Sequence, residues 1–164
     1  MRTILISGAS SGIGLNIAHR ELKAGNRISI GIRDIDSIKG SVIDPNNWPN
    51  EKILINKYDA LDKLSAKEWV RNTVNKFGGF DTLINCAGVL SKIPFLFKDG
   101  EEDEISNIIN INFLAIWNLC RLSWDNLRQS KNGRIIVLVS MSGKRSKGDL
   151  AAYSSSKFAL MSLC

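Results

Sequence analysis

The chain has 164 residues, of which 44% are hydrophobic and 23% are charged, and its formal net charge is +6. This length fits one domain, 1–164, and the hydrophobic share is enough for a buried core, which excludes a disordered chain. Basic residues are scattered except for Lys144, Arg145 and Lys147, so we predict a solvated surface and no nucleic-acid partner.

Short runs rich in β-branched residues alternate with longer segments of helical period. The predicted strands are 3–7, 27–32, 53–56, 81–85 and 134–140. The predicted helices are 12–24, 63–77, 103–129 and 151–163, with Asp103 or Ser106 as the candidate cap of the third. Strict alternation predicts an α/β fold of the Rossmann-like type, a doubly wound parallel sheet with helices on both faces.

The first strand runs into a glycine-rich loop, and a helical pattern follows at once. Glycines let the backbone approach a pyrophosphate, and the helix start would direct free N–H groups and its positive dipole end at the phosphates. The spacing G-x-x-x-G-x-G, with no Lys-Ser/Thr after it, excludes a Walker-type loop. We predict a dinucleotide site here, with a tight turn that binds no ligand as the alternative. The predicted contacts are Gly8, Ser10, Ser11, Gly12, Ile13 and Gly14.

Several motifs in order make the chain resemble the short-chain dehydrogenase/reductase family over essentially its whole length. SGASSGIG at 7–14 stands where the family has TGxxxGIG. DTLINCAG at 81–88 stands for its DxLxNNAG motif, with Cys86 in place of the second asparagine. Tyr153 and Lys157 match its YxxxK pair. Further cofactor contacts implied by the resemblance are Asp59, Ala60, Asn85, Ala87 and Gly88; for Asp59, a solvated loop carboxylate is the alternative.

Tyr153 and Lys157 are four residues apart, so both project from one face of a predicted helix. Tyrosine alone is a poor base near neutrality, and a nearby ammonium favours its phenolate. We therefore predict that Tyr153 exchanges a proton with the substrate oxygen. The resemblance implies that Lys157 and Tyr153 also bind the cofactor, and that Ser140 and Asn112 complete the catalytic group. The alternative for Tyr153 and Lys157 is a pair on a helix surface without a catalytic role. The alternative for Ser140 is a serine at a strand end that bonds to its own turn, and for Asn112 a polar position on a partly exposed helix.

The end of the second predicted strand bears on the choice of cofactor. An acidic residue there would bind a ribose 2′-OH, but this position is Ile32 and Arg33 follows it. Because arginine pairs well with phosphate, NADP(H) is the favoured cofactor and NAD(H) the alternative. Asp34 or Asp36 would favour NAD(H) if the strand ended two residues later.

The three cysteines, Cys86, Cys120 and Cys164, form no CxxC pair, which is typical of reduced thiols in a cytoplasmic protein. No apolar run reaches the roughly 18–20 residues that cross a bilayer, so we predict no membrane partner. No group of His, Cys and carboxylates has ligand spacing, so we predict no metal site.

The leading hypothesis is an oxidoreductase that moves a hydride between the nicotinamide and a small carbonyl or secondary alcohol substrate. The family continues beyond residue 164, so we expect a fold truncated before the last two strands. A dinucleotide-binding module or sensor without turnover, or a structural subunit, is therefore the alternative. The predicted helix 103–129 is apolar over more than one face, and the resemblance implies a homodimer or homotetramer formed through it.

Overall fold

Five parallel strands form one sheet in this computed structural model, which describes residues 1–163. The strand order is β3-β2-β1-β4-β5. The strands are β1 (Thr3–Ser7), β2 (Arg27–Ile32), β3 (Ile53–Lys57), β4 (Thr82–Asn85) and β5 (Arg134–Val137). The chain moves outward from β1 to β3 and then returns to β4 on the other side of β1. This reversal opens a crevice beyond the carboxyl ends of β1 and β4, where ligands bind in doubly wound folds.

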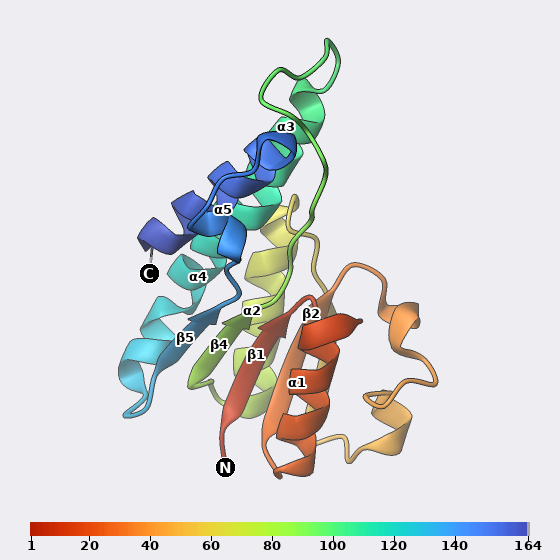
Figure 1. Cartoon of the computed structure of the whole chain (residues 1–164). Coiled ribbons are helices and arrows are strands. Elements are labelled where there is room, and N and C mark those ends of the chain that lie inside the picture. Colours follow the sequence, from red (N-terminus) through yellow and green to blue (C-terminus); the bar gives the residue numbers. More distant parts are fainter. Residues whose placement is uncertain (164) are drawn as a thin grey trace.

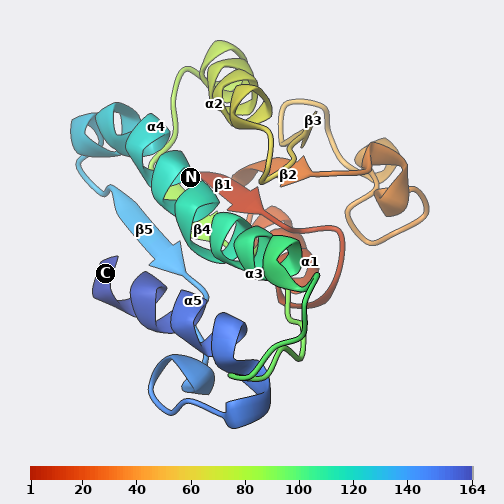
Figure 2. The same ribbon diagram turned by 90° about the horizontal axis from the view of Figure 1, so that it is seen from above.

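Helices cover both faces of the sheet, which confirms the predicted fold class (Figures 1 and 2). The helices are α1 (Gly12–Lys23), α2 (Lys63–Phe77), α3 (Glu102–Ile109), α4 (Ala115–Gln129) and α5 (Ala151–Leu163). Successive side chains of a strand point to opposite faces. Ile6 of β1 therefore packs in the same buried cluster as Ala18 of α1, whereas Leu5 packs with Trp69 of α2 and Leu119 of α4.

The predicted helix 103–129 is interrupted, and its predicted cap is wrong. α3 and α4 are joined by a π-helical turn over Asn110–Leu114. α3 begins after Glu101, so Asp103 and Ser106 lie inside the helix. The carboxylate of Glu101 accepts a hydrogen bond from the Lys98 N–H, so the preceding turn is closed by this residue.

β5 is shorter than predicted and ends at Val137. Val137 pairs with Asn85, the last residue of β4, so the ladder has no partner residues beyond it. Among the described residues β5 pairs only with β4, and Ile135 and Ile136 are 39% and 45% exposed on its two faces. The following residues form a 3₁₀ turn, η4 (Met141–Gly143), that leads toward α5.

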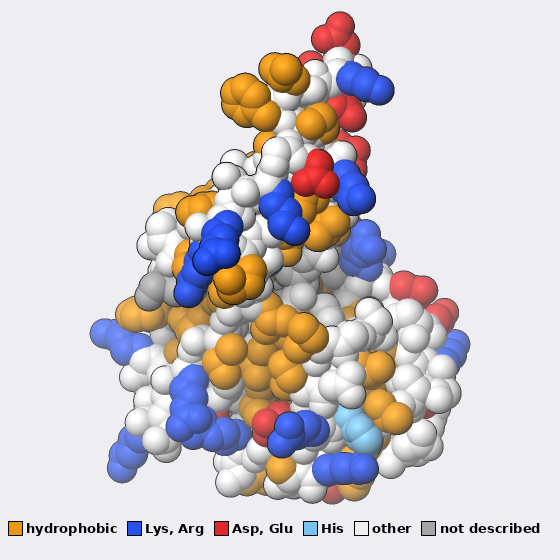
Figure 3. Space-filling model, in the orientation of Figure 1, with side chains coloured by type: hydrophobic (Ala, Val, Ile, Leu, Met, Phe, Trp, Pro, Cys, Tyr) orange, Lys and Arg blue, Asp and Glu red, His pale blue; other side chains and the backbone are white. Residues whose placement is uncertain are grey.

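The amino end of α5 is fixed to the loop that follows β4. The Ala151 N–H donates to the Ile93 carbonyl at 3.0 Å, and Ile93 packs with Ile108 of α3 and Ala152 of α5. The loop after β4, α3 and the amino end of α5 form the part of the molecule that projects above the sheet in Figure 1. Lys and Arg side chains are spread over the visible face, with Asp and Glu among them (Figure 3). Within the described residues, no helix is both long enough and apolar enough to cross a membrane.

Candidate active site

A cavity of about 550 Å³ lies beyond the carboxyl ends of the central strands. This volume is in the range of small-molecule and cofactor sites. Most residues predicted to contact a dinucleotide line it: Gly8, Ser10, Ser11, Gly12, Ile13, Gly14, Arg33, Asp59, Ala60, Ala87 and Gly88. The lining also includes residues for which the sequence predicts no role, among them Ser37, Tyr58, Val89, Ile111 and Leu138. Several of these residues follow the ends of strands, and this position is the only feature of the sequence from which their place in the lining could be predicted.

The turn after β1 is shaped by two glycines with left-handed backbone. Gly8 has a φ of +69°, and a Cβ atom placed on it would lie 2.7 Å from the Ala87 backbone. Gly8 therefore lets the loops after β1 and β4 touch. Gly12 has a φ of +55°, and a Cβ atom on it would meet no atom within 4 Å. The backbone at Gly12 is thus open to the cavity that it lines.

The first turn of α1 faces the same cavity. Ser11 is the residue before the helix, and its side chain makes no capping hydrogen bond. The first turn contains no acidic residue. Free N–H groups and the positive end of the helix dipole therefore point toward the cavity wall formed by Gly12 and Ile13. This arrangement suits a pyrophosphate, so the residues present fit the phosphate part of a dinucleotide.

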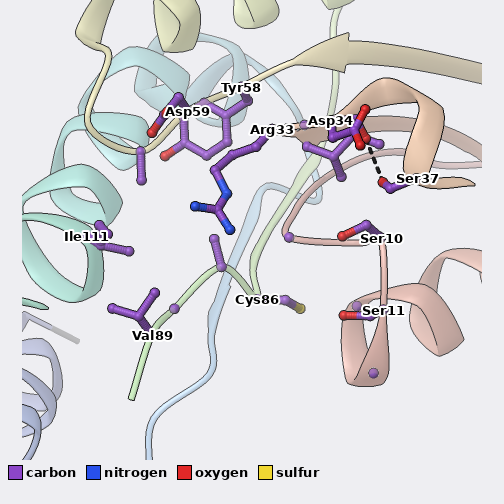
Figure 4. Close-up of a pocket in the computed structure, with 18 of the residues that line it drawn as sticks. Ser10, Ser11, Arg33, Asp34, Ser37, Tyr58, Asp59, Cys86, Val89 and Ile111 are labelled. Atoms are coloured by element: carbon purple, nitrogen blue, oxygen red, sulfur yellow. Dashed lines mark hydrogen bonds between the residues drawn. The ribbon is translucent and has the colours of Figure 1, made fainter. Parts of the chain in front are cut away.

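Arg33 and Asp34 follow β2 and are oriented differently. The Arg33 side chain extends into the cavity, between the Tyr58–Asp59 segment and the loop that bears Cys86 and Val89 (Figure 4). The Asp34 carboxylate accepts a hydrogen bond from the Asp36 N–H at 3.0 Å and so caps the 3₁₀ turn Ile35–Ile38. Arg33 is the cationic side chain in the cavity lining, and Asp34 also lines the cavity while its carboxylate caps its own turn.

Tyr58 and Asp59 form another wall of the cavity. The Tyr58 ring is buried against Trp69, with ring centroids 5.1 Å apart. Burial raises the pKa of Tyr58 to about 12, so its hydroxyl remains protonated at neutral pH. The Asp59 carboxylate accepts a hydrogen bond from the Leu61 N–H at 2.9 Å. It has further acceptor capacity that can face a ligand.

The predicted acid–base pair lies on α5, behind the wall of the cavity. The Lys157 Nζ atom is 5.8 Å from the centroid of the Tyr153 ring, and it donates a hydrogen bond to the Leu138 carbonyl at 3.0 Å. Lys157 is only 5% exposed, and burial lowers its pKa. Leu138 itself lines the cavity, so the buried amine joins the cavity wall to the tyrosine.

Asn112 is fully buried in the π-helical turn. Its side-chain oxygen accepts from the Val89 N–H at 2.8 Å, and its amide group donates to the Val89 carbonyl at 2.8 Å and to the Ser156 hydroxyl at 3.1 Å. A Cβ atom on Gly88 would lie 3.2 Å from the Asn112 oxygen and 3.7 Å from the Lys157 amine. The two side chains thus converge behind the cavity wall.

Two predicted site residues are placed differently from the others. The Ser140 hydroxyl accepts a hydrogen bond from the Ser142 N–H at 3.1 Å, and it can still donate its own proton. Asn85 is buried below the cavity and does not line it; its amide group donates to the Cys120 sulfur at 3.8 Å. The Asn85 side chain therefore faces the interior, and its contact with a cofactor stays a prediction. In residues 1–163, no group of His, Cys, Asp and Glu could hold a metal ion.

The sheet order, the glycine turn and the residues around the cavity define the Rossmann-like α/β class. The sequence profile described as short chain dehydrogenase matches residues 2–164. The chain belongs to the short-chain dehydrogenase family, whose members bind NAD(P)(H). This confirms the family indicated by the sequence motifs.

Individual relatives agree with this assignment. Agropine synthesis reductase of Rhizobium rhizogenes is 32% identical over 157 residues, which cover 96% of this chain and 35% of that protein. Dehydrogenase/reductase SDR family protein 7-like of Dictyostelium discoideum is 30% identical over 164 residues, covering 98% and 52%. The crystal structure of a short-chain dehydrogenase/reductase (glucose/ribitol dehydrogenase) from Brucella melitensis has a TM-score of 0.89 at 26% identity, covering 99% and 66%. The chain therefore spans about a third of the first of these two curated relatives and about half of the second.

Proposed function

We propose that this chain carries the cofactor site and the acid–base pair of an oxidoreductase that interconverts a small carbonyl compound and its secondary alcohol. The proposal rests mainly on the position of Lys157, which is buried between the Tyr153 ring and the Leu138 carbonyl in the cavity wall. When bound, the nicotinamide dinucleotide supplies or accepts the hydride. The chain's own residues bind and orient the reactants and move the accompanying proton.

Tyr153 is the proposed acid–base residue. Its hydroxyl donates a proton to the substrate oxygen during reduction and accepts that proton during oxidation. The Lys157 ammonium stabilises the phenolate left after donation, because the amine is buried 5.8 Å from the centroid of the Tyr153 ring. Ser140 donates a hydrogen bond to the substrate oxygen and orients it toward Tyr153. Asn112 holds the Val89 loop at the cavity wall.

NADP(H) is the proposed cofactor, and Arg33 is the residue that selects it. The Arg33 side chain extends into the cavity, and a guanidinium group can pair with a 2′-phosphate through two hydrogen bonds. The neighbouring Asp34 also lines the cavity, and its carboxylate accepts one hydrogen bond at the start of its own 3₁₀ turn, so NAD(H) is kept as the alternative cofactor.

We also propose a cytoplasmic homodimer or homotetramer. Trp117 and Trp124 of α4 are 51% and 57% exposed, and large exposed aromatic side chains are enriched at interfaces between subunits. The Cys86 side chain is a free thiol, as is usual in a reducing compartment.

A dinucleotide-binding sensor without turnover is the second candidate. It is favoured by the positions of Tyr153 and Lys157, neither of which lines the cofactor cavity. The two functions share the cofactor cavity and differ in whether proton transfer occurs.

Cofactor titration followed by turnover assays separates the two candidates. We expect NADPH fluorescence to change on binding and NADPH to be oxidised with at least some members of a ketone and aldehyde panel. Tyr153→Phe should lower turnover by about 10²–10⁴-fold while leaving the NADPH Kd within a few fold. Binding without oxidation across the panel would favour the sensor. Unchanged turnover in Tyr153→Phe would exclude this mechanism.

A further inference from the structure

Ser156 is a fully buried hydroxyl residue between the two members of the acid–base pair in the chain. Its Oγ atom donates a hydrogen bond to the Tyr153 carbonyl at 2.7 Å, one turn earlier on α5. The same oxygen accepts a hydrogen bond from the Asn112 side-chain amide at 3.1 Å. A hydroxyl has one proton to donate, so Ser156 uses its donor within α5 and an acceptor site toward the π-helical turn.

The Asn112 amide extends this connection to the cofactor cavity. One of its N–H bonds goes to Ser156, and another goes to the Val89 carbonyl, while its oxygen accepts from the Val89 N–H. An amide NH₂ group has two protons, so both are used. Val89 lines the cavity, and a continuous path of hydrogen bonds therefore runs from the cavity wall to the backbone of Tyr153.

Directional hydrogen bonds hold α5 at three points along its length: the Ala151 N–H, the Lys157 amine and the Ser156 hydroxyl. The contacts of α5 with α3 involve small or aliphatic side chains such as Ala152 and Ile108, which are not directional. Hydrogen bonds are directional, and those between buried groups weaken steeply when the angle is lost. The Asn112–Ser156 bond therefore helps to fix the rotation of α5, and with it the direction in which Tyr153 projects.

We propose that Ser156 is a positioning residue for the reaction, which sets the orientation of Tyr153 and Lys157 through Asn112. This inference rests on the proposed function for its catalytic consequence, but the structural link itself does not. In Ser156→Ala, one Asn112 N–H loses its partner in the interior, and the π-helical turn and α5 are no longer joined at this point. The cavity residues that hold the cofactor are not changed.

The chain offers a matched control on the same helix. Ser154 is also buried on α5, and its hydroxyl has no hydrogen-bond partner within the described part of the chain. Ser154→Ala removes the same atoms from the same helix without breaking a link to Asn112. Ser156→Thr keeps the hydroxyl group and tests whether the hydrogen bonds, rather than the small size of the residue, are required.

The first measurement is kinetic. We expect Ser156→Ala to lower kcat about ten- to a hundredfold, as small misplacements of reacting groups do, with the NADPH Kd within twofold of the wild type. We also expect the pH profile of kcat to shift, because the orientation of Lys157 toward Tyr153 changes. Ser156→Thr should recover most of kcat, and Ser154→Ala should keep both kcat and its pH profile. Equal kinetics in Ser156→Ala and Ser154→Ala would overturn the proposal.

The second measurement is amide hydrogen exchange, which does not depend on turnover. We expect faster exchange of the Asn112 side-chain amide and the Val89 N–H in Ser156→Ala than in Ser154→Ala. If the wild type shows no turnover, the proposed function fails while this comparison still decides the role of Ser156. Equal exchange in the two variants would refute the positioning role even if an activity were found.

Discussion

The Lys157 amine lies 5.8 Å from the centroid of the Tyr153 ring while it donates a hydrogen bond to the Leu138 carbonyl at 3.0 Å. One buried group thus contacts both the proposed acid–base residue and the wall of the cofactor cavity. The environment that shields this amine from water also lowers its pKa, because burial disfavours the charged form. Function and stability are therefore coupled at Lys157, and they can be separated by substitution.

Lys157→Met should abolish most turnover and change the pH dependence of stability. In the unfolded chain the Lys157 amine keeps its proton up to about pH 10.5, its ordinary pKa. In the folded chain the amine loses this proton at a lower pH, because burial lowers its pKa. In the window between these two values the unfolded state binds more protons, so the Lys157 contribution to stability rises with pH. The free energy of unfolding of the wild type minus that of Lys157→Met should therefore increase from neutrality toward pH 10.5. Urea titrations across this range measure the difference, and a difference that fell with pH would contradict the burial of the amine.

Cys86 should behave as a protected thiol. Burial raises the pKa of Cys86 from 9.0 to about 11, and the side chain lines the cofactor cavity. Alkylation at pH 8 should be slower than in the urea-unfolded chain, because only the thiolate reacts, and NADPH should slow it further. Mass spectrometry of the labelled peptides distinguishes the Cys86 thiol from Cys120, and Cys86→Ser is the control for this distinction.

The same pKa predicts a loss of stability at high pH. Between pH 9 and about 11 the thiol ionises in the unfolded chain first, so the folded state binds more protons and the Cys86 contribution to stability decreases. The free energy of unfolding of the wild type minus that of Cys86→Ser should fall through this window. A difference independent of pH would show that the thiol is well hydrated.

Gly8→Ala should lower the stability more than the same substitution at a glycine that also has a positive φ but has no atom near its Cβ position. Gly8 combines a φ of +69° with a Cβ position 2.7 Å from the Ala87 backbone. Strain and overlap together should cost about 2–4 kcal/mol of stability and weaken NADPH binding. Gly25 has a φ of +80° with no atom within 4 Å of an added Cβ, so Gly25→Ala should cost about 1 kcal/mol. Thermal unfolding of both variants measures the cost, and equal values would mean that the loop after β4 can move away.

Local patterns predicted the scaffold, and nonlocal contacts explain what they missed. The strands β1 and β2 and the helix α2 have the predicted bounds, because their residue preferences and turn signals agree with the final fold. The π-helical turn was not predicted, since Asn112 is bonded to Val89 and Ser156, which are 23 and 44 residues away in the chain. The helical period of a sequence does not predict a hydrogen-bond partner that lies so far away in the chain.

The cavity was predicted in the same uneven way. The glycine turn carries its own signal, and all six of its predicted contact residues line the cavity. The motif around Asn85 predicts a ligand contact, whereas the alternation of side chains along β4 directs the Asn85 amide toward Cys120 and the interior. Tyr58 was missed because an aromatic residue after a strand also fits the core, and here it belongs to both the core and the cavity wall.

Arg33→Ala should reduce the preference for NADPH over NADH. The guanidinium group extends into the cavity, and charge-assisted bonds to a 2′-phosphate contribute about 1.5–3 kcal/mol, or roughly ten- to a hundredfold in Kd. We expect the NADPH Kd to rise by this factor and the NADH Kd to stay within twofold, because NADH has no phosphate at this position. Arg20→Ala on α1 removes the same charge from a residue that does not line the cavity, and it controls for long-range electrostatics. If both cofactors bound equally to the wild type, or if Arg33→Ala weakened both alike, the guanidinium group would have no role in selecting the cofactor.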